Sequence, residues 1–198
     1  MSNRQKGFRK TRPGIVILGE GLTEQFYFQH LKRIKGLHCT VEPRLQRNTS
    51  ISSFEKKIKD LIENDIHVIC VFDADVAEKN QVEKDRLNEF KEKFGAHPKV
   101  TLCDSLPSLE YWFLLHFQEG KSVTCDARSV TRTLKKHIVN YSKTKKFLNN
   151  EKWVRDMTEG KGNLDQAMQR AEDAVTIEKP DHCPYSNVFK GIRLMMSH

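Results

Sequence analysis

The sequence lacks the features that define several protein classes. None of its 198 residues lie in an apolar run near the roughly 18–20 residues that a membrane span needs, so we expect no membrane association. Its five cysteines include no Cys-x-x-Cys pair, which disfavours a disulfide framework and a cysteine-rich zinc site alike. It has no Gly-x-x-x-x-Gly-Lys-Ser/Thr motif, so we do not expect it to hydrolyse nucleotides by itself. These absences favour a single domain in a reducing compartment, which we take to be cytoplasmic.

Positive charge is concentrated in two regions. Lys and Arg outnumber Asp and Glu by 34 to 26, which gives a formal net charge of +8 at pH 7. Residues 1–13 hold five bases and no acid, and residues 121–161 hold eleven bases and four acids. This distribution suits a polyanion that crosses the protein, because neutralised phosphates release counterions. The alternative is a charged surface that only keeps the protein soluble.

Hydrophobic patterning predicts an α/β fold. Uninterrupted apolar runs at Ile15–Leu18 and Val68–Phe72 indicate strands that are buried on both faces, as in a parallel sheet. Weaker strands are expected at 39–45, on an edge of the sheet, and at 99–103. Helices are expected after an N-cap at Thr23, after a capping box at 52–55, around Leu87 to Phe94, and at 109–117, 127–139, 143–156, 164–175 and 188–196.

This order of elements predicts a mostly parallel central sheet flanked by helices, with a C-terminal helical extension. No strand is expected after about residue 120. We divide the chain into a basic N-terminal arm (1–13), an α/β core (14–120) and a helical, basic C-terminal region (121–198) that packs on the core.

Acidic residues follow both strong strands. Glu20 lies between Gly19 and Gly21 after the first run, and Asp73 and Asp75 follow the second. Parallel strands end at one edge of a sheet, where ligands bind, so we expect these side chains to be close together. If the strand persists through Asp75, both aspartates point to one side, about 7 Å apart. Such carboxylates raise one another's pKa, and a divalent cation, Mg²⁺ or Mn²⁺, relieves the repulsion.

A turn or an N-cap is the alternative role for an Asp-x-Asp that follows a strand. A metal site beside a basic surface, by contrast, indicates metal-assisted phosphodiester chemistry.

The combination of Glu20 with Asp73 and Asp75 resembles a Toprim domain, the catalytic module of topoisomerases, primases and OLD nucleases. More narrowly, the chain resembles the RloB family, Toprim-like proteins of bacterial defence loci. The matching segments are Glu-Gly-Leu-Thr-Glu-Gln-Phe-Tyr-Phe (20–28), Val-Phe-Asp-Ala-Asp (71–75), Ser-Leu-Pro-Ser-Leu-Glu-Tyr-Trp-Phe-Leu-Leu-His-Phe (105–117), Tyr-Ser-Lys (141–143) and Pro-Tyr-Ser-Asn-Val (184–188). The chain departs from the family pattern at Leu106 and Leu109, which stand where asparagine and phenylalanine are usual, and at Ala74, where arginine is common.

The resemblance implies a Toprim-like sheet and a nuclease site. Glu20, Asp73 and Asp75 would be catalytic, with Glu20 near the scissile phosphate as a metal ligand or general acid/base and the two aspartates holding one or two Mg²⁺ ions. Glu24 and Glu110 would add metal ligands. Glu24 can instead interact with the dipole of its helix, and Glu110 can instead cap its own helix.

Basic residues of the C-terminal region are candidates for nucleic-acid binding. Lys143, Lys145 and Lys146 could hold a phosphate backbone while Tyr141 stacks on a base. The further candidates are Arg132 and Lys136. An exposed helix start is the alternative for the lysines. His116 is expected to be a buried, hydrogen-bonded histidine.

We therefore expect a Mg²⁺-dependent endonuclease that cleaves DNA or RNA, with tRNA among the targets, in antiphage defence of the abortive-infection kind. The resemblance implies a separate ATPase as protein partner, and a homodimer is left open. One alternative is a catalytically inactive Toprim-like binding or regulatory subunit of an ATPase-containing complex. Another is a nucleotide-processing or polymerising enzyme that uses the same metal site.

Overall fold

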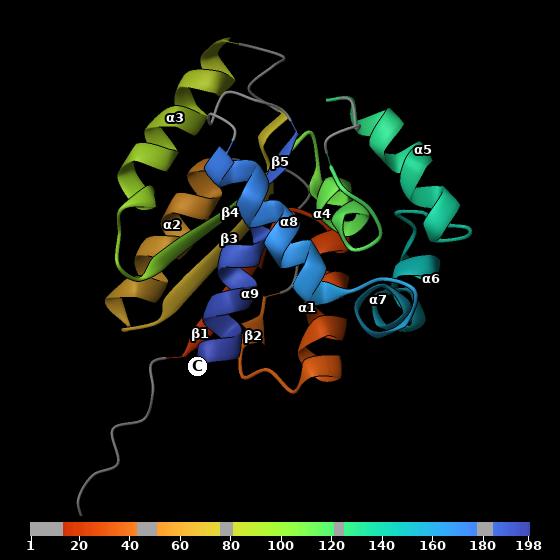
Figure 1. Ribbon diagram of the computed structural model, residues 1–198. Coiled ribbons are helices and arrows are strands. Elements are labelled where there is room, and N and C mark those ends of the chain that lie inside the picture. The colour runs from red at the N-terminus through yellow and green to blue at the C-terminus, as the bar shows by residue number, and fades with distance from the viewer. Residues whose placement is uncertain (1–13, 43–50, 76–80, 121–124, 178–183) are drawn as a thin grey trace, which may run out of the picture.

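The computed structural model describes residues 14–42, 51–75, 81–120, 125–177 and 184–198, so the predicted basic arm at 1–13 lies outside the described residues. Figure 1 shows the elements. In chain order they are β1 (Ile15–Gly19), α1 (Leu22–Lys35), β2 (Thr40–Val41), α2 (Ile51–Glu63), β3 (His67–Asp73), α3 (Gln81–Gly95), β4 (Val100–Leu106), α4 (Leu109–Leu115), α5 (Ala127–His137), α6 (Lys145–Leu148), α7 (Lys152–Arg155), a π-helical segment (Asp156–Gly160), α8 (Leu164–Ile177), β5 (Tyr185–Ser186) and α9 (Val188–Ser197).

The central sheet has the strand order β2-β1-β3-β4-β5. The first four strands are parallel, and β5 pairs with β4 in the antiparallel direction. The predicted α/β fold with a mostly parallel sheet is thus confirmed, as is the C-terminal helical extension. The expectation that no strand follows residue 120 was wrong, because β5 has two residues and is too short to produce a hydrophobic pattern.

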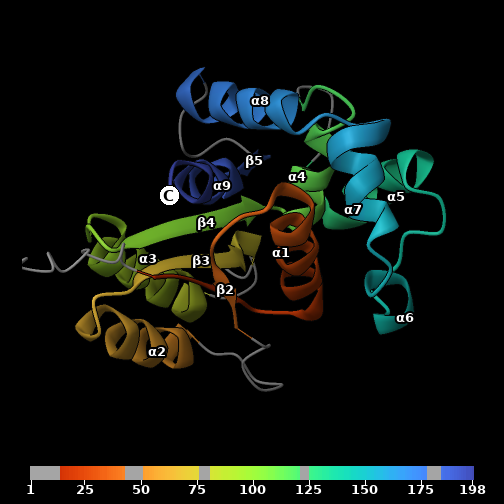
Figure 2. The same ribbon diagram turned by 90° about the horizontal axis from the view of Figure 1, so that it is seen from below.

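Alternation along β1 divides the core into two layers. Val16 and Leu18 face one side of the sheet and pack with α2 and α3, whereas Ile15 and Ile17 face the other side, in the core formed with α1, α4 and α9. Figure 2 shows α2 and α3 below the sheet, with α9 and α8 above it. Because helices cover both faces, the strands are apolar without interruption, which is the pattern that the sequence displays.

The C-terminal helices are held to this core by close packing. The helix α9 approaches β4 through Gly191, where an added Cβ atom would lie 2.7 Å from Sγ of Cys103. A glycine at this position therefore permits the close approach. Helices α5 and α8 contact α4, and α7 contacts α1.

Several local predictions are corrected by the structure. The N-cap of α1 is Gly21 rather than Thr23, which lies inside the helix. The helix α2 already includes Ile51, so it begins before the expected capping box at 52–55. The expected helix at 143–156 is broken into α6 and α7, followed by a π-helical segment.

The oxidation state of the cysteines differs in part from the one expected. Cys39, Cys70 and Cys103 are free and buried, but Cys125 is disulfide-bonded, which departs from the expectation of a reduced chain.

Within the described ranges, no helix combines the length and the apolar character needed to cross a lipid bilayer.

Candidate active site at the carboxyl edge of the sheet

The ends of β1 and β3 bring three of the predicted carboxylates together. Gly19, the last residue of β1, is paired with Val71 of β3, so Glu20 follows β1 at the level where β3 ends. The backbone amide of Asp73 hydrogen-bonds to the Glu20 carboxylate, and the charge of Asp75 also acts on that carboxylate. The edge that the sequence predicted is therefore the edge at which Glu20, Asp73 and Asp75 gather.

The conformation of the Asp-x-Asp segment differs from the one expected. The strand β3 ends at Asp73, and Ala74 and Asp75 form a 3₁₀ turn rather than continuing the strand. The argument that strand spacing points both aspartates to one side was therefore wrong. Asp73 also binds α4, since its Oδ1 accepts a hydrogen bond from the Leu109 amide at 2.8 Å. The N-cap residue of α4 is Ser108, so Asp73 contacts the start of this helix from a distant part of the chain and stays at the acidic edge.

Glu24 is buried in the first turn of α1 and lies against the glycines of the Gly-Glu-Gly turn. A Cβ atom added to Gly19 would lie 2.6 Å from Cβ of Glu24, and one added to Gly21 would lie 2.8 Å from its Oε2. Both glycines therefore make room for this side chain. Oε2 of Glu24 is buried and has no hydrogen-bond partner among the residues that the structure describes. A buried carboxylate oxygen without a partner is costly, and a cation would satisfy it.

Glu110 is fully buried at the start of α4 and is surrounded by donors. Its Oε1 lies 2.8 Å from Nζ of Lys143 and accepts a hydrogen bond from the Tyr141 hydroxyl at 2.8 Å. Its Oε2 accepts a hydrogen bond from the Ser108 hydroxyl at 2.7 Å. The side chain is thus well satisfied, and its charge also acts on Asp73 and Glu24.

We call Glu20, Glu24, Asp73, Asp75 and Glu110 the carboxylate cluster. Burial, and then the charge of Glu24, raise the pKa of Glu20 to about 7. Burial raises the pKa of Glu24, and burial together with the charges of Glu24 and Glu110 raises the pKa of Asp73 well above its ordinary value. Burial and mutual repulsion thus raise the pKa of Glu20, Glu24 and Asp73.

Glu110 is the member of the cluster whose charge is neutralised by a neighbour. Burial alone would raise its pKa, but Lys143 and the hydrogen bonds from Ser108 and Tyr141 lower it. The same ion pair changes the pKa of Lys143. Burial would lower that pKa, but the charge of Glu110 and the hydrogen bond to it outweigh burial and raise it. Lys143 thus belongs to the acidic edge.

The cluster fits a hard divalent cation in its chemistry. All of its donors are carboxylate oxygens, which Mg²⁺ and Mn²⁺ prefer, and the unsatisfied Oε2 of Glu24 points to a missing partner. Glu20, Glu24 and Asp73 are the residues that would hold such an ion, with Asp75 beside them. As the side chains stand, no three His, Cys, Asp or Glu residues of the described ranges are grouped so that they could hold a metal ion. Carboxylate rearrangement would therefore accompany binding.

The predicted nucleic-acid-binding residues fall into two groups. Arg132 and Lys136 on α5 and Lys145 and Lys146 on α6 are exposed, as phosphate contacts require. Lys143 is different because its ammonium group reaches the buried Glu110.

Tyr141 was placed in the wrong role by the sequence. Its ring is 1% exposed and its hydroxyl binds Glu110, so the prediction that it stacks on a base is corrected. The Tyr-Ser-Lys segment at 141–143 is the sequence signal that could have placed Tyr141 at this site, because it matches the family pattern. The lysines that follow it indicated instead an exposed contact with a nucleic-acid strand. His116 is buried and its Nδ1 lies 3.0 Å from the Trp112 carbonyl oxygen, but its Nε2 is buried without a hydrogen-bond partner among the described residues, so the expected satisfied histidine is confirmed only in part.

The fold and this edge define an α/β protein with a carboxylate cluster where its parallel strands end. A model of the family described as RloB-like protein matches residues 15–195. The chain belongs to this RloB-like family. Comparison with curated proteins and with solved structures gave no match.

Proposed function

We propose that this RloB-like protein is a metal-dependent nuclease that hydrolyses phosphodiester bonds in DNA or RNA. The single observation that carries the proposal is the carboxylate cluster, in which Glu24 and Glu110 are buried and Oε2 of Glu24 has no hydrogen-bond partner among the described residues. Buried carboxylates that raise one another's pKa are typical of sites that bind a cation or move protons. A bound Mg²⁺ or Mn²⁺ would polarise the scissile phosphate and favour ionisation of water.

The residues of the chain would divide the remaining work. In hydrolysis a water oxygen forms a bond to phosphorus, the ester P–O bond breaks, a carboxylate takes the water proton and the leaving oxygen gains a proton. Glu20, whose pKa is raised to about 7 in the absence of a metal ion, is the carboxylate that would take this proton. Lys143 would offer its positive charge to the phosphate as negative charge develops there. The exposed bases Arg132, Lys136, Lys145 and Lys146 would hold the backbone of the strand.

The decisive experiment compares Asp73→Asn with wild type. Purified protein is incubated with single-stranded and duplex DNA, RNA and tRNA in Mg²⁺, Mn²⁺ or EDTA, and Mn²⁺ binding is measured by calorimetry. We expect metal-dependent cleavage that Asp73→Asn reduces at least about a hundredfold, with loss of Mn²⁺ binding. Asp85→Asn on the exposed face of α3 is the matched control and should leave both unchanged. Cleavage that survives Asp73→Asn and EDTA would overturn the proposal.

On the resemblance to Toprim-like proteins of bacterial defence loci, we extend the proposal to a role in antiphage defence and to a partner ATPase that controls the nuclease. This part is tested by phage infection of cells that carry the gene and its neighbours. Protection should depend on Asp73 and on an ATPase encoded nearby. Protection that persists with the ATPase gene deleted would contradict the partner.

A catalytically inactive binding or regulatory subunit is the second candidate. The observation that favours it is the absence, in the described ranges, of three side chains grouped to hold a metal. It predicts no Mn²⁺ binding by calorimetry and antiphage protection that Asp73→Asn leaves intact. The same assays therefore separate the two candidates.

A further inference from the structure

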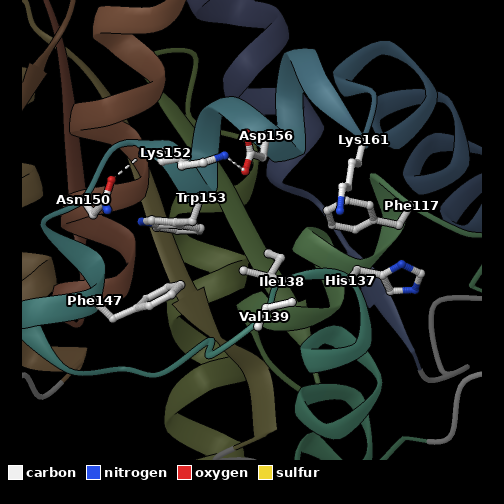
Figure 3. Close-up of a pocket in the computed structure, with 10 residues that line it drawn as sticks. All are labelled: Phe117, His137, Ile138, Val139, Phe147, Asn150, Lys152, Trp153, Asp156 and Lys161. Atoms are coloured by element: carbon white, nitrogen blue, oxygen red, sulfur yellow. Dashed lines mark hydrogen bonds and ion pairs between the residues drawn. The ribbon is translucent and has the colours of Figure 1, made fainter.

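The C-terminal region contains a pocket that lies outside the carboxylate cluster. Its volume is about 270 Å³, near the lower end of the roughly 300–1,000 Å³ of small-molecule sites. Figure 3 shows the residues that line it. They are Phe117, His137, Ile138, Val139, Phe147, Asn150, Lys152, Trp153, Asp156 and Lys161.

Aromatic rings form two opposing walls of this pocket. Trp153 and Phe147 lie on one side, with ring centroids 6.1 Å apart. Phe117 and His137 lie on the other side as a stacked pair, 4.8 Å apart and 8° from parallel. The planes of Trp153 and Phe147 are tilted by 36°, and rings that line a pocket from two sides suit a planar, π-rich ligand.

The Trp153 wall is held in place from behind. Its ring nitrogen donates a hydrogen bond to the Leu148 carbonyl oxygen at 3.2 Å. The ring packs against Phe113 at 5.2 Å and against Tyr27 at 6.2 Å, both in the main core. Since Trp153 is anchored on these sides, the pocket is preformed and a ligand need not order the ring on binding.

The rim of the pocket carries positive charge. Lys152 is paired with Asp156, so its charge is partly neutralised. Lys161 is exposed and forms no ion pair with the other described residues. The surrounding segment, residues 121–161, is the most basic part of the chain by net charge. An anionic group attached to the planar ligand would therefore meet Lys161.

One aromatic residue joins this pocket to the carboxylate cluster. Tyr141 packs against Phe147 at 5.5 Å and against Trp153 at 6.2 Å, behind the pocket wall. The hydroxyl of the same residue binds Glu110 of the cluster. The two sites are thus neighbours across a single buried ring.

We propose that this pocket binds the base of an unpaired nucleotide, stacked between the aromatic walls, with the phosphate of that nucleotide at Lys161. The ligand chemistry is that of a nucleotide, and its source is either a base of the substrate strand or a free mononucleotide. The strand as source rests on the proposed nuclease function. A duplex base is excluded, because it cannot enter a pocket of this size without leaving its stack.

Trp153 provides a direct readout of occupancy. The chain has two tryptophans, and both are buried, with 4% of Trp153 and 0% of Trp112 exposed, but of the two only Trp153 lines the pocket, while Trp112 donates a hydrogen bond to the Tyr27 hydroxyl. A base that stacks on Trp153 should quench its fluorescence. The full-length protein is titrated in EDTA, which prevents cleavage. The ligands are the four nucleoside monophosphates, a single strand of about ten nucleotides and the matching duplex.

The matched variants are Lys161→Glu and Lys56→Glu. Both reverse one exposed charge, but Lys56 lies on α2, which covers the other face of the sheet. We expect a single strand or a mononucleotide to quench the fluorescence and the duplex to do so much less. Lys161→Glu should lower the affinity for the ligand that quenches the fluorescence about five- to tenfold, and Lys56→Glu should lower it less than twofold. Quenching by mononucleotides as tight as by the strand identifies a free nucleotide as the source, and quenching by the strand alone identifies the substrate.

Two results would overturn the pocket assignment. One is an unchanged fluorescence spectrum at strand concentrations that saturate binding by anisotropy. The other is an equal loss of affinity in Lys161→Glu and Lys56→Glu. Asp73→Asn keeps the two proposals apart, since it should abolish cleavage and leave the quenching intact. Quenching that depends on Lys161 in a protein that never cleaves would retain the pocket and reject the nuclease.

Discussion

Nζ of Lys143 lies 2.8 Å from Oε1 of Glu110, a carboxylate that is 1% exposed. The lysine comes from the C-terminal region, and the glutamate begins the helix that follows β4. The charge of Lys143 also acts on Glu24 and Asp73, so the C-terminal region contributes a cation to the edge where the parallel strands end. The cation that pairs with Glu110 of the carboxylate cluster therefore comes from outside the α/β core.

Removing this cation should destabilise the protein. Lys143→Met leaves the charge of Glu110 buried with only hydroxyl partners, but the lysine side chain is 56% exposed and solvent screens the pair, so we expect the free energy of unfolding to fall by about 1–2 kcal/mol. Urea denaturation measures the change. Lys146→Met, an exposed lysine three residues away, is the control and should cost less than about 0.5 kcal/mol. Equal effects of the two substitutions would show that the ion pair contributes nothing to stability.

The raised pKa of Glu20 predicts how stability depends on pH. The folded state holds the Glu20 proton up to about pH 7, whereas the unfolded chain releases it near 4.5. The folded state binds the proton more tightly, so stability falls as the pH rises from 4.5 through 7. In EDTA, wild type should lose about 1–3 kcal/mol more than Glu20→Gln between pH 5 and pH 8, by urea denaturation.

The control for this experiment is Glu63→Gln, at an exposed position at the end of α2, which should follow the wild-type pH profile. Added Mn²⁺ should restore stability to wild type at pH 8, because a bound cation favours the ionised carboxylates. Parallel pH profiles for wild type and Glu20→Gln would contradict the perturbed carboxyl.

Asp104 should be the residue that fastens β5 to the sheet. Its buried carboxylate pairs with Lys91 and accepts hydrogen bonds from the Tyr185 hydroxyl at 2.7 Å and the Asn187 amide at 2.8 Å. Burial would raise its pKa, but these partners lower it. Asp104→Asn leaves Lys91 without its anion, and we expect a loss of about 2–4 kcal/mol.

Hydrogen exchange provides a second measurement of the Asp104→Asn variant. The amides of residues 185–187 should exchange faster, while those of β1 keep their protection relative to global unfolding. Asp60→Asn, on the exposed face of α2, is the control. Unchanged exchange at β5 would show that backbone pairing alone holds this strand.

The exposed bases of α5 and α6 should set the salt dependence of nucleic-acid binding. Replacing Arg132, Lys136 and Lys145 by alanine should reduce the slope of log K against log salt by about 2–3, since each lost phosphate contact removes nearly one released counterion. Anisotropy with a labelled strand at several salt concentrations measures the slope.

The matched control replaces three exposed bases of α2 and α3, namely Lys56, Lys59 and Lys84. These helices cover the opposite face of the sheet, and their variant should keep the wild-type slope. An equal decrease in both variants would indicate non-specific attraction by net charge rather than a defined path for the strand.

The sheet and one half of the carboxylate cluster could be predicted from the sequence. Apolar runs at Ile15–Leu18 and Val68–Phe72 have a single simple explanation, burial on both faces, and the structure places them as neighbouring parallel strands. Glu20 and Asp73 directly follow these runs, so their position at one edge follows from the direction of the strands. No comparable signal marks β5, whose two residues depend on pairing with β4.

Side-chain partners depended on contacts between distant segments. The burial of Tyr141 and the pairing of Lys143 with Glu110 are decided by how the C-terminal region packs on α4. A basic segment has the same local pattern whether its lysine faces a phosphate or a buried glutamate.

The amino-acid order by itself determined the two central strands, most of the helices and which carboxylates follow those strands, because hydrophobic periodicity and strand direction are local properties. Tertiary structure alone decided which charge neutralises which and where an aromatic pocket opens. Those outcomes depend on burial and on distances between residues far apart in the chain, and neither quantity exists before the chain has folded.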